Sequence, residues 1–317
     1  MKYFLLLVLY LQLALAHAAY PNHPIRLIVA YPPGGGTDIV SRLIVPELSK
    51  KLGQSIAIDN RGGASGNIGT EAAVNSPPDG YTLLMGNIAP NAINVSMFKK
   101  LPYQPERDLI PISLVAITPN ILVANMKLPV KSVADLLALA KANPGKMNFP
   151  SAGSGTSSHL AGVLFCNMAN VDMVHVPYKG GGIAMNDLLG GQVDIYFATM
   201  PAAIPFIKSG KLRPLGVTSE KRSIVLPNVP TISESGLAGY SATTWYGLYA
   251  PKGTPSDIIQ KVHEATVEVL KIPEIREQLI QRGFEPIGNS PDQFANFVSS
   301  EIIKWGKVVK LAGIEPE

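Results

Sequence analysis

The pattern of apolar and polar positions predicts strands that alternate with helices. Residues 25–31 (IRLIVAY) form a nearly continuous apolar run, which is typical of a strand buried on both faces of a sheet. The turn PPGGG follows, and apolar residues then recur at helical spacing as far as Gly53, a helix-ending residue. The same patterns predict strands at 56–58 and 81–85 and helices at 256–270, 275–282 and 291–311. This alternation predicts an α/β fold with mostly parallel sheets.

Three times an apolar run enters a glycine-rich turn and then a helix. The three segments are IRLIVAY-PPGGGTD-IVSRLI at 25–44, MNFP-SAGSGTSSH-LAGVLF at 147–165 and MVHVPY-KGGG-IAMNDLL at 173–189. Thr37 and Thr156 are far apart in the sequence, so we expect the first two turns in different halves of the molecule. Ligands of open α/β sheets bind at the carboxyl ends of strands, where such turns lie. The repetition predicts a ligand cleft.

Glycine-rich turns at helix starts favour an anionic ligand. The first backbone N–H groups of a helix are unpaired and lie at the positive end of its dipole, and glycine lets a ligand approach them closely. A carboxylate or a phosphate fits such a site. Asp38 has two interpretations: it stabilises its helix dipole, or it contacts a cationic group or ordered water on the ligand. A single turn could simply need flexible, capped geometry, but three in one chain favour a binding cleft.

Nucleotide and enzyme motifs fit poorly. GGGTD lacks the G-K-[ST] ending of a P-loop, and GSGTSS has Ser158 where a dinucleotide-binding turn has its third glycine. No G-x-S-x-G occurs, and no two histidines have a metal-binding helical spacing, so we expect no metal and no cofactor. His159, near several serines, is interpreted as a capping or cleft-lining residue. A secreted serine hydrolase that uses a serine and His159 is the alternative.

The first residues predict export. Lys2 precedes a short apolar run that ends in alternating alanines, and the run is too short to span a membrane. We therefore predict a signal peptide at 1–18 and a periplasmic protein. Hydrophobic residues make up 46% and charged residues 16%, which excludes a disordered chain. The net charge is +4, but no Lys/Arg-rich run is present, so we expect no nucleic-acid partner.

Several motifs together resemble the Bug family, the periplasmic solute-binding proteins of tripartite tricarboxylate transporters (the TctC type). They include YPNHPIRLIVAYPPGGGTDIVSRLI, LGQSIAIDNRGGASGNIGTEAA, PDGYTLLMGN, NFPSAGSGTSSHLAG, VPYKGGG, DLLGGQVD and GKLRPLGVTSEKR. The resemblance covers the chain after the predicted signal, and the order and spacing of the motifs make it specific. It departs at Gly62, where the family often has proline, and at Asn91, where it often has histidine.

The resemblance implies a two-domain α/β fold of the type II periplasmic-binding-protein kind, with each domain a mostly parallel sheet flanked by helices and the ligand cleft between them. We expect domain 1 to comprise 19–119 and 241–317 and domain 2 to comprise 120–240. The resemblance also implies that backbone amides and ordered water from the first two turns hold a ligand carboxylate. The implied residues are Gly34, Gly35, Gly36, Thr37 and Asp38 in one lobe and Gly153, Ser154, Gly155, Thr156, Ser157 and His159 in the other. Four wall residues are added because they follow predicted strands: Asn87, Ala89, Tyr178 and Thr199.

The implied function is the capture of a small organic acid, such as a dicarboxylate, a tricarboxylate, an acidic amino acid or an aromatic carboxylate. The lobes close on the acid, and the protein delivers it to a membrane permease of a large and a small subunit without chemical change. We expect a monomer. A binding protein that feeds a sensor instead of a transporter is equally compatible with the sequence.

Overall fold

The computed structural model describes residues 20–311 and 314–316, and the predicted signal segment 1–18 lies outside them. The strands are β1 (Ile25–Val29), β2 (Ile56–Asn60), β3 (Thr82–Asn87), β4 (Leu109–Asn125), β5 (Asn148–Ser151), β6 (Val174–Pro177), β7 (Ile195–Thr199), β8 (Leu212–Val217), β9 (Thr243–Pro251) and β10 (Glu285–Pro286). The helices are α2 (Gly36–Leu52), α3 (Asn67–Val74), α4 (Asn94–Met97), α5 (Pro105–Asp108), α6 (Val133–Ala142), α7 (Ser157–Ala169), α8 (Gly181–Gly190), α9 (Met200–Lys208), α10 (Ser256–Lys271), α11 (Pro273–Gln281) and α12 (Pro291–Leu311), with a 3-10 turn η1 (Ala64–Gly66) and a π-helical turn η2 (Ala89–Ile93).

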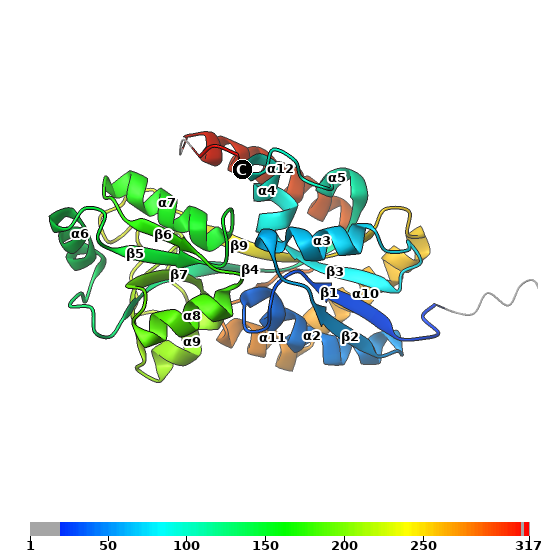
Figure 1. Ribbon diagram of the computed structural model, residues 1–317. Helices are drawn as coiled ribbons and strands as arrows, with labels where there is room; N and C mark the ends of the chain where they lie inside the picture. The colour runs from blue at the N-terminus through cyan, green and yellow to red at the C-terminus, as the bar shows by residue number, and fades with distance from the viewer. Residues whose placement is uncertain (1–19, 312–313, 317) are drawn as a thin grey trace, which may run out of the picture.

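Two α/β lobes share the long strand β4 (Figure 1). The first half of β4 belongs to the sheet with the order β10-β4-β9-β3-β1-β2, and its second half pairs with β7 and β8. The partner of β4 changes from β9 to β7 between Pro119 and Asn120. The two-strand sheet β5-β6 lies in the lobe of β7, where α6 to α9 are also found (Figure 1). The expected two-lobe α/β fold is confirmed.

The strand pairing is mixed, which corrects the expectation of mostly parallel sheets. In the described chain, β1 runs parallel to β2 and β3, and β5 runs parallel to β6. By contrast, β9 is antiparallel to β3 and β4, and β4 is antiparallel to β7, β8 and β10. The parallel pairs are those joined by crossover helices, as the sequence indicates. The antiparallel pairs arise because β4 and β9 lead the chain from one lobe to the other.

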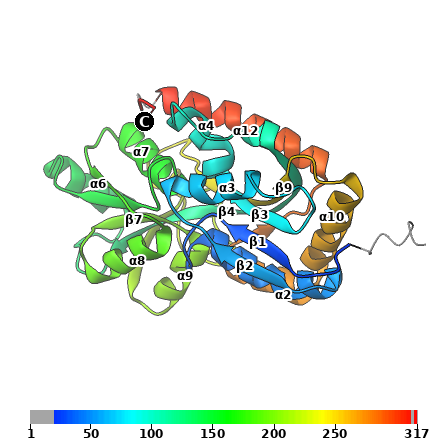
Figure 2. The ribbon, with the colours of Figure 1, turned by 45° about the vertical axis from the view of Figure 1, so that its right-hand side comes forward.

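Helices cover both faces of the main sheet. On one face α2 and α10 pack against each other and against the sheet, and their apolar residues share one buried cluster with those of β1, as Leu48 and Leu27 do. On the other face α3 and α12 cover the sheet, and α12 lies along the outside of this lobe (Figure 2). Glu301 of α12 accepts hydrogen bonds from the indole N–H groups of Trp245 (3.0 Å) and Trp305 (2.9 Å). Among the described residues, no helix is both long and apolar enough to cross a membrane.

The helices α2, α7, α8 and α9 begin shortly after β1, β5, β6 and β7, respectively. Their N-termini therefore lie at the carboxyl ends of these strands. The first two of the predicted glycine-rich turns lie in different lobes, as expected, and the third lies with the second. This arrangement points the starts of several helices toward the space between the lobes.

Candidate functional site

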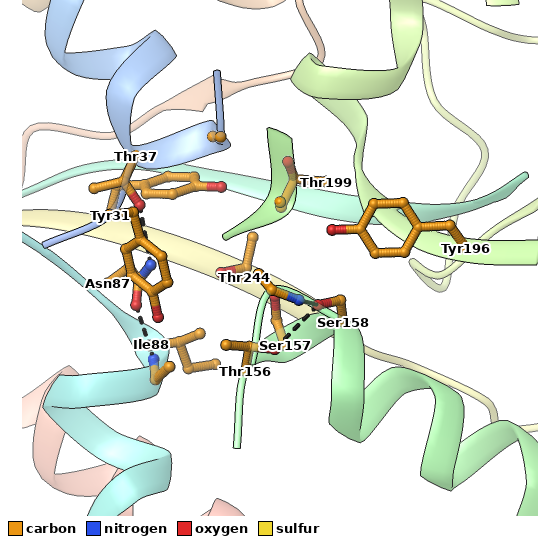
Figure 3. A pocket seen from close by; sticks show the side chains of 16 residues that line it. Tyr31, Thr37, Asn87, Ile88, Thr156, Ser157, Ser158, Tyr196, Thr199 and Thr244 are labelled. Carbon is orange, nitrogen blue, oxygen red and sulfur yellow. Dashed lines mark hydrogen bonds between the residues drawn. The ribbon is translucent and has the colours of Figure 1, made fainter. Parts of the chain in front are cut away.

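A cavity lies between the lobes, with side chains of both facing the same space (Figure 3). Its empty space amounts to about 440 Å³, a figure that includes open solvent at its mouth. We call it the inner cavity. Its lining residues are Tyr31, Gly35, Gly36, Thr37, Asn87, Ile88, Ala89, Ala152, Thr156, Ser157, Ser158, Gly181, Tyr196, Thr199, Thr244 and Tyr246.

Helix N-termini from both lobes meet at the inner cavity. α2 starts after Gly35 and α7 after Thr156, and neither helix has a side-chain hydrogen bond capping its N-terminus in the structure as described. The same holds for α8 and α9, which begin after Gly180 and Thr199. Each helix start presents free N–H groups and about half a positive charge. An anion in the inner cavity would supply the missing hydrogen-bond acceptor to helices of both lobes.

The inner cavity has no charged lining residue in the described structure, and its polar groups are mostly hydroxyls. One of them, the Tyr246 hydroxyl, is buried without a hydrogen-bond partner among the described residues. Burial raises the pKa of Tyr246, so the hydroxyl stays protonated and can donate. An unpaired buried donor costs free energy unless a ligand satisfies it. Its place on the cavity wall therefore indicates a ligand with a hydrogen-bond acceptor.

Hydrogen bonds fix the polar walls. Asn87 donates from Nδ2 to Thr37 Oγ1 (3.0 Å), and its Oδ1 accepts from the Ala89 amide (3.0 Å). In the other lobe, Thr156 Oγ1 donates to the Gly153 carbonyl (2.6 Å), which closes the second turn on itself. Such bonds hold the helix starts in place before a ligand arrives.

A second cavity, here called the outer cavity, shares Tyr31 and Ala152 with the inner one. It encloses about 710 Å³, including open solvent. Lys179 is the one charged side chain among the described residues that line it. The full lining is Tyr31, Gly63, Ala64, Ser65, Gly66, Phe98, Ala152, Gly153, Ser154, Pro177, Tyr178 and Lys179. The outer cavity therefore differs from the inner one chiefly in having a cationic side chain in its lining.

The sequence-predicted site residues divide between these cavities. The inner cavity takes eight of them: Gly35, Gly36, Thr37, Asn87, Ala89, Thr156, Ser157 and Thr199. The outer cavity takes Gly153, Ser154 and Tyr178. Four line neither cavity: Gly34, Asp38, Gly155 and His159. Asn91, where the Bug family often has histidine, is fully buried and also lines neither cavity.

Asp38 holds the first turn together. Its carboxylate accepts hydrogen bonds from the Gly34 amide (3.0 Å), Arg42 Nε (2.9 Å) and Asn60 Nδ2 (3.0 Å). Burial alone would raise the pKa of Asp38, but these hydrogen bonds and the Arg42 charge outweigh it and hold the pKa below its usual range. Of the two interpretations of Asp38, the structure supports the role at its own helix start.

His159 supports the second turn in a similar way. Its Nδ1 accepts a hydrogen bond from the Gly155 amide (3.1 Å), and its ring stacks on His175 with 3.9 Å between centroids. His175 Nε2 in turn contacts Ser151 Oγ at 2.6 Å. Burial lowers the pKa of His159 to about 3 and that of His175 to about 4, so both imidazoles are neutral near pH 7. The described residues contain no group of three His, Cys, Asp or Glu that could hold a metal ion.

Sequence reasoning missed several cavity residues. Tyr31 ends the first apolar run, so its place next to the first turn was a usable signal. Tyr196 and Tyr246 lie inside strands and bear no local mark of a site. The others missed in the inner cavity are Ile88, Ala152, Gly181 and Thr244. Strand residues reach the cavity only because β9 and β7 flank the point where the lobes meet.

Comparison with known proteins shows the family of the chain. The model of the tripartite tricarboxylate transporter family receptor matches residues 40–314. The chain belongs to this receptor family. The receptor is 40% identical to Protein BugT of Bordetella pertussis over 295 residues, which cover 93% of this chain and 90% of that protein.

Solved structures of similar proteins include two with bound acids. Rpa4515 of R. palustris with adipate has a TM-score of 0.92 and 37% identity, and the match covers 94% of this receptor and 100% of that chain. MatC (Rpa3494) of Rhodopseudomonas palustris with bound malate has a TM-score of 0.87 and 33% identity, covering 92% and 100%. The family and its structural neighbours are binding proteins, among them the periplasmic binding protein BugD.

Proposed function

We propose that this receptor captures a small carboxylate between its lobes and delivers it, chemically unchanged, to a tripartite tricarboxylate-type permease with a large and a small membrane subunit. The observation that carries the proposal is the meeting of uncapped helix N-termini from both lobes on a cavity without charged residues. A carboxylate there gains hydrogen bonds and two favourable helix dipoles at once. Because the two dipoles belong to different lobes, the ligand itself favours the closed form.

One carboxylate is placed in the inner cavity in this proposal. The first amides of α2 and α7 and the Tyr246 hydroxyl are its donors, with Thr37 and Ser157 beside it. Four predicted residues act without contacting the ligand, by holding the turns that carry those amides: Gly34 with Asp38, and Gly155 with His159.

A second carboxylate is proposed in the outer cavity. Adipate and malate, bound by two similar proteins, are both dicarboxylic acids. The cation of Lys179, which lines the outer cavity, suits a second negative group, and the shared lining residues Tyr31 and Ala152 make the two cavities neighbours. We therefore propose a dicarboxylate as the ligand class.

The lobes are proposed to be the domains 19–119 with 241–317, and 120–240, with hinges near 115–120 and 240–245. The change of partner along β4 between Pro119 and Asn120 supports the first hinge. We also propose a periplasmic location, reached through a cleaved signal at 1–18, as suits a member of this family. A monomer is expected because one chain supplies both walls of the cavity.

Calorimetric titration of the purified protein tests the function. The panel contains adipate, malate, the monocarboxylate hexanoate and the uncharged diamide of adipate. We expect at least one acid to bind and to raise the unfolding temperature by mass action, and the diamide not to bind. Binding of the diamide with the affinity of the acid would contradict an anion site, and no binding by any carboxylate would contradict the function.

A further inference from the structure

The loop between β2 and α3 has an uncommon backbone where it meets the other lobe. Ala64 and Ser65 have φ values of 45° and 54°. This is the left-handed region of the backbone, which residues other than glycine, asparagine and aspartate rarely adopt. Glycines flank them on both sides, at Gly63 and Gly66. Non-glycine residues keep such a conformation only when the surroundings impose it, and such residues gather at ligand clamps and switch regions.

The surroundings fix the Ser65 backbone by its carbonyl oxygen. This oxygen accepts hydrogen bonds from the Tyr31 hydroxyl (2.8 Å) and from Asn94 Nδ2 (3.2 Å). Asn94 is itself held by Asn67 Oδ1 (2.6 Å), and Ser65 is only 8% exposed. The carbonyl and its partners belong to one lobe, so the side chain of Ser65 is presented to the other lobe in a fixed direction.

The Ser65 hydroxyl crosses the space between the lobes and donates a hydrogen bond to the Ser154 carbonyl. The receiving turn has room for it because Gly153 has no side chain, and a Cβ there would lie 2.7 Å from Ser65 Oγ. Both partners line the outer cavity, and Ser154 lies in the turn that leads into α7. Tyr31, which holds Ser65 in place, lines both cavities. The bond between the lobes therefore closes over the place proposed for the ligand.

We propose that Ser65 is a latch: its hydrogen bond to Ser154 stabilises the closed form and slows ligand release without touching the anion in the inner cavity. This inference rests on the proposed function. Ser65 acts as a positioning residue, because it holds the Gly153–Ser154 turn against the opposite lobe. The left-handed backbone at Ser65 directs the Ser65 hydroxyl toward the other lobe. The hydrogen bond from Tyr31 to the Ser65 carbonyl connects the latch to the wall of the proposed ligand site.

Two substitutions separate the latch from a purely structural role. Ser65→Gly removes the hydroxyl and also relieves the left-handed backbone, so the unliganded protein should unfold at the same or a higher temperature. Ligand dissociation, followed by stopped flow for each acid that the wild type binds, should still be faster by about three- to tenfold, the worth of one hydrogen bond. Ser65→Ala should show the same increase in dissociation rate. Association rates should change little.

Asn170→Gly is the matched control, since Asn170 also has a left-handed backbone (φ 50°) but caps α7 away from both cavities. Its dissociation rates should equal those of the wild type. Unchanged dissociation rates in Ser65→Gly and Ser65→Ala would overturn the latch while leaving the proposed function intact.

Small-angle X-ray scattering gives a reading that needs no ligand. If the wild type bound no acid, the proposed function would fail separately, and the latch would be judged by lobe closure alone. We expect the unliganded Ser65→Gly protein to have a larger radius of gyration than the wild type, and in that case identical scattering of the two proteins would refute the latch.

Discussion

The Tyr246 hydroxyl lies against Gly36 so closely that a Cβ on Gly36 would be 2.1 Å from it. Gly36 is the first residue of α2, and Tyr246 comes from β9, far along the chain. The missing side chain thus allows the buried hydroxyl to lie next to the first amides of the helix. This contact joins the two kinds of donor that the inner cavity offers to an anion.

Gly36→Ala should weaken binding without preventing folding. Alanine suits a helix better than glycine, but its methyl group would push Tyr246 into the inner cavity. Overpacking of this size costs about 1–3 kcal/mol, which corresponds to an affinity loss of roughly 5- to 150-fold in calorimetry. Gly306→Ala in α12, outside the cavities, is the control and should bind normally. Wild-type affinity in Gly36→Ala would contradict this close contact.

Tyr246→Phe should lower affinity while leaving the unliganded protein as stable or more so. The hydroxyl is buried without a hydrogen-bond partner in the part of the chain that the structure describes, so its loss removes a desolvation cost in the free protein but a donor in the complex. We expect an affinity loss of about tenfold. Tyr249→Phe is matched, because Tyr249 also has a buried, unpartnered hydroxyl but lines neither cavity. Equal affinities for the two variants would argue against a role of Tyr246 in binding.

Gly182→Ala should act as a wedge between the lobes. A Cβ on Gly182 would lie 2.9 Å from the Pro33 carbonyl oxygen of the other lobe, while its own backbone is helical and accepts alanine. The expected result is a weaker ligand affinity with an unfolding temperature of the unliganded protein that is unchanged or higher. Gly190→Ala in the same helix, whose Cβ would meet its nearest neighbour at 4.0 Å, should retain affinity. If Gly182→Ala and Gly190→Ala lowered the unfolding temperature equally, the effect of Gly182→Ala would be on folding and not on closure of the lobes.

Lys179→Met should change ligand selectivity. If the Lys179 cation faces a second carboxylate, its removal weakens adipate binding by about fivefold or more and leaves hexanoate binding nearly unchanged. The ratio of the two dissociation constants, measured by calorimetry, is the test. Lys211→Met, at an exposed lysine outside both cavities, should leave the ratio as it is. A ratio unaffected by Lys179→Met would remove Lys179 from the proposed site.

The His159–His175 pair should make the protein less stable in mild acid. An unfolded histidine titrates near pH 6.5, whereas burial lowers the folded pKa of His159 to about 3 and of His175 to about 4. Between these values the unfolded chain binds more protons, so the free energy of unfolding decreases as the pH falls below about 6.5. Allowing for the partial exposure of His175, we expect a loss of about 2 kcal/mol from pH 7 to pH 5 in urea titrations.

His175→Gln tests the origin of this loss. The variant should have a smaller difference in stability between pH 7 and pH 5, since one of the two imidazoles with a lowered pKa is gone. His23→Gln, at an exposed histidine, should keep the wild-type difference. If both variants retain the full difference, groups other than this pair determine the acid sensitivity.

The local part of the site could be predicted from the sequence, because short segments determine it. A buried apolar run, a glycine-rich turn and a helix follow one another along the chain at Gly35–Gly36 and at Thr156–Ser157, and these are the helix starts that face the inner cavity. The predicted helix at 291–311 likewise coincides with α12. Predicting mostly parallel sheets failed for β4 and β9 because the periodicity of a strand carries no information on the direction of its partner.

Local patterns thus predicted the α/β elements and the helix starts that face the inner cavity, and the ordered motifs indicated the receptor family. The packing of distant segments places the other side chains around the two cavities: Tyr246 lies against Gly36, Ser65 contacts Ser154, and Asp38 and His159 hold the two turns. The physical reason is the range of the interactions. Helix starts and turns depend on neighbours within a few residues, whereas the contacts between lobes depend on how distant segments pack, and no local pattern records that.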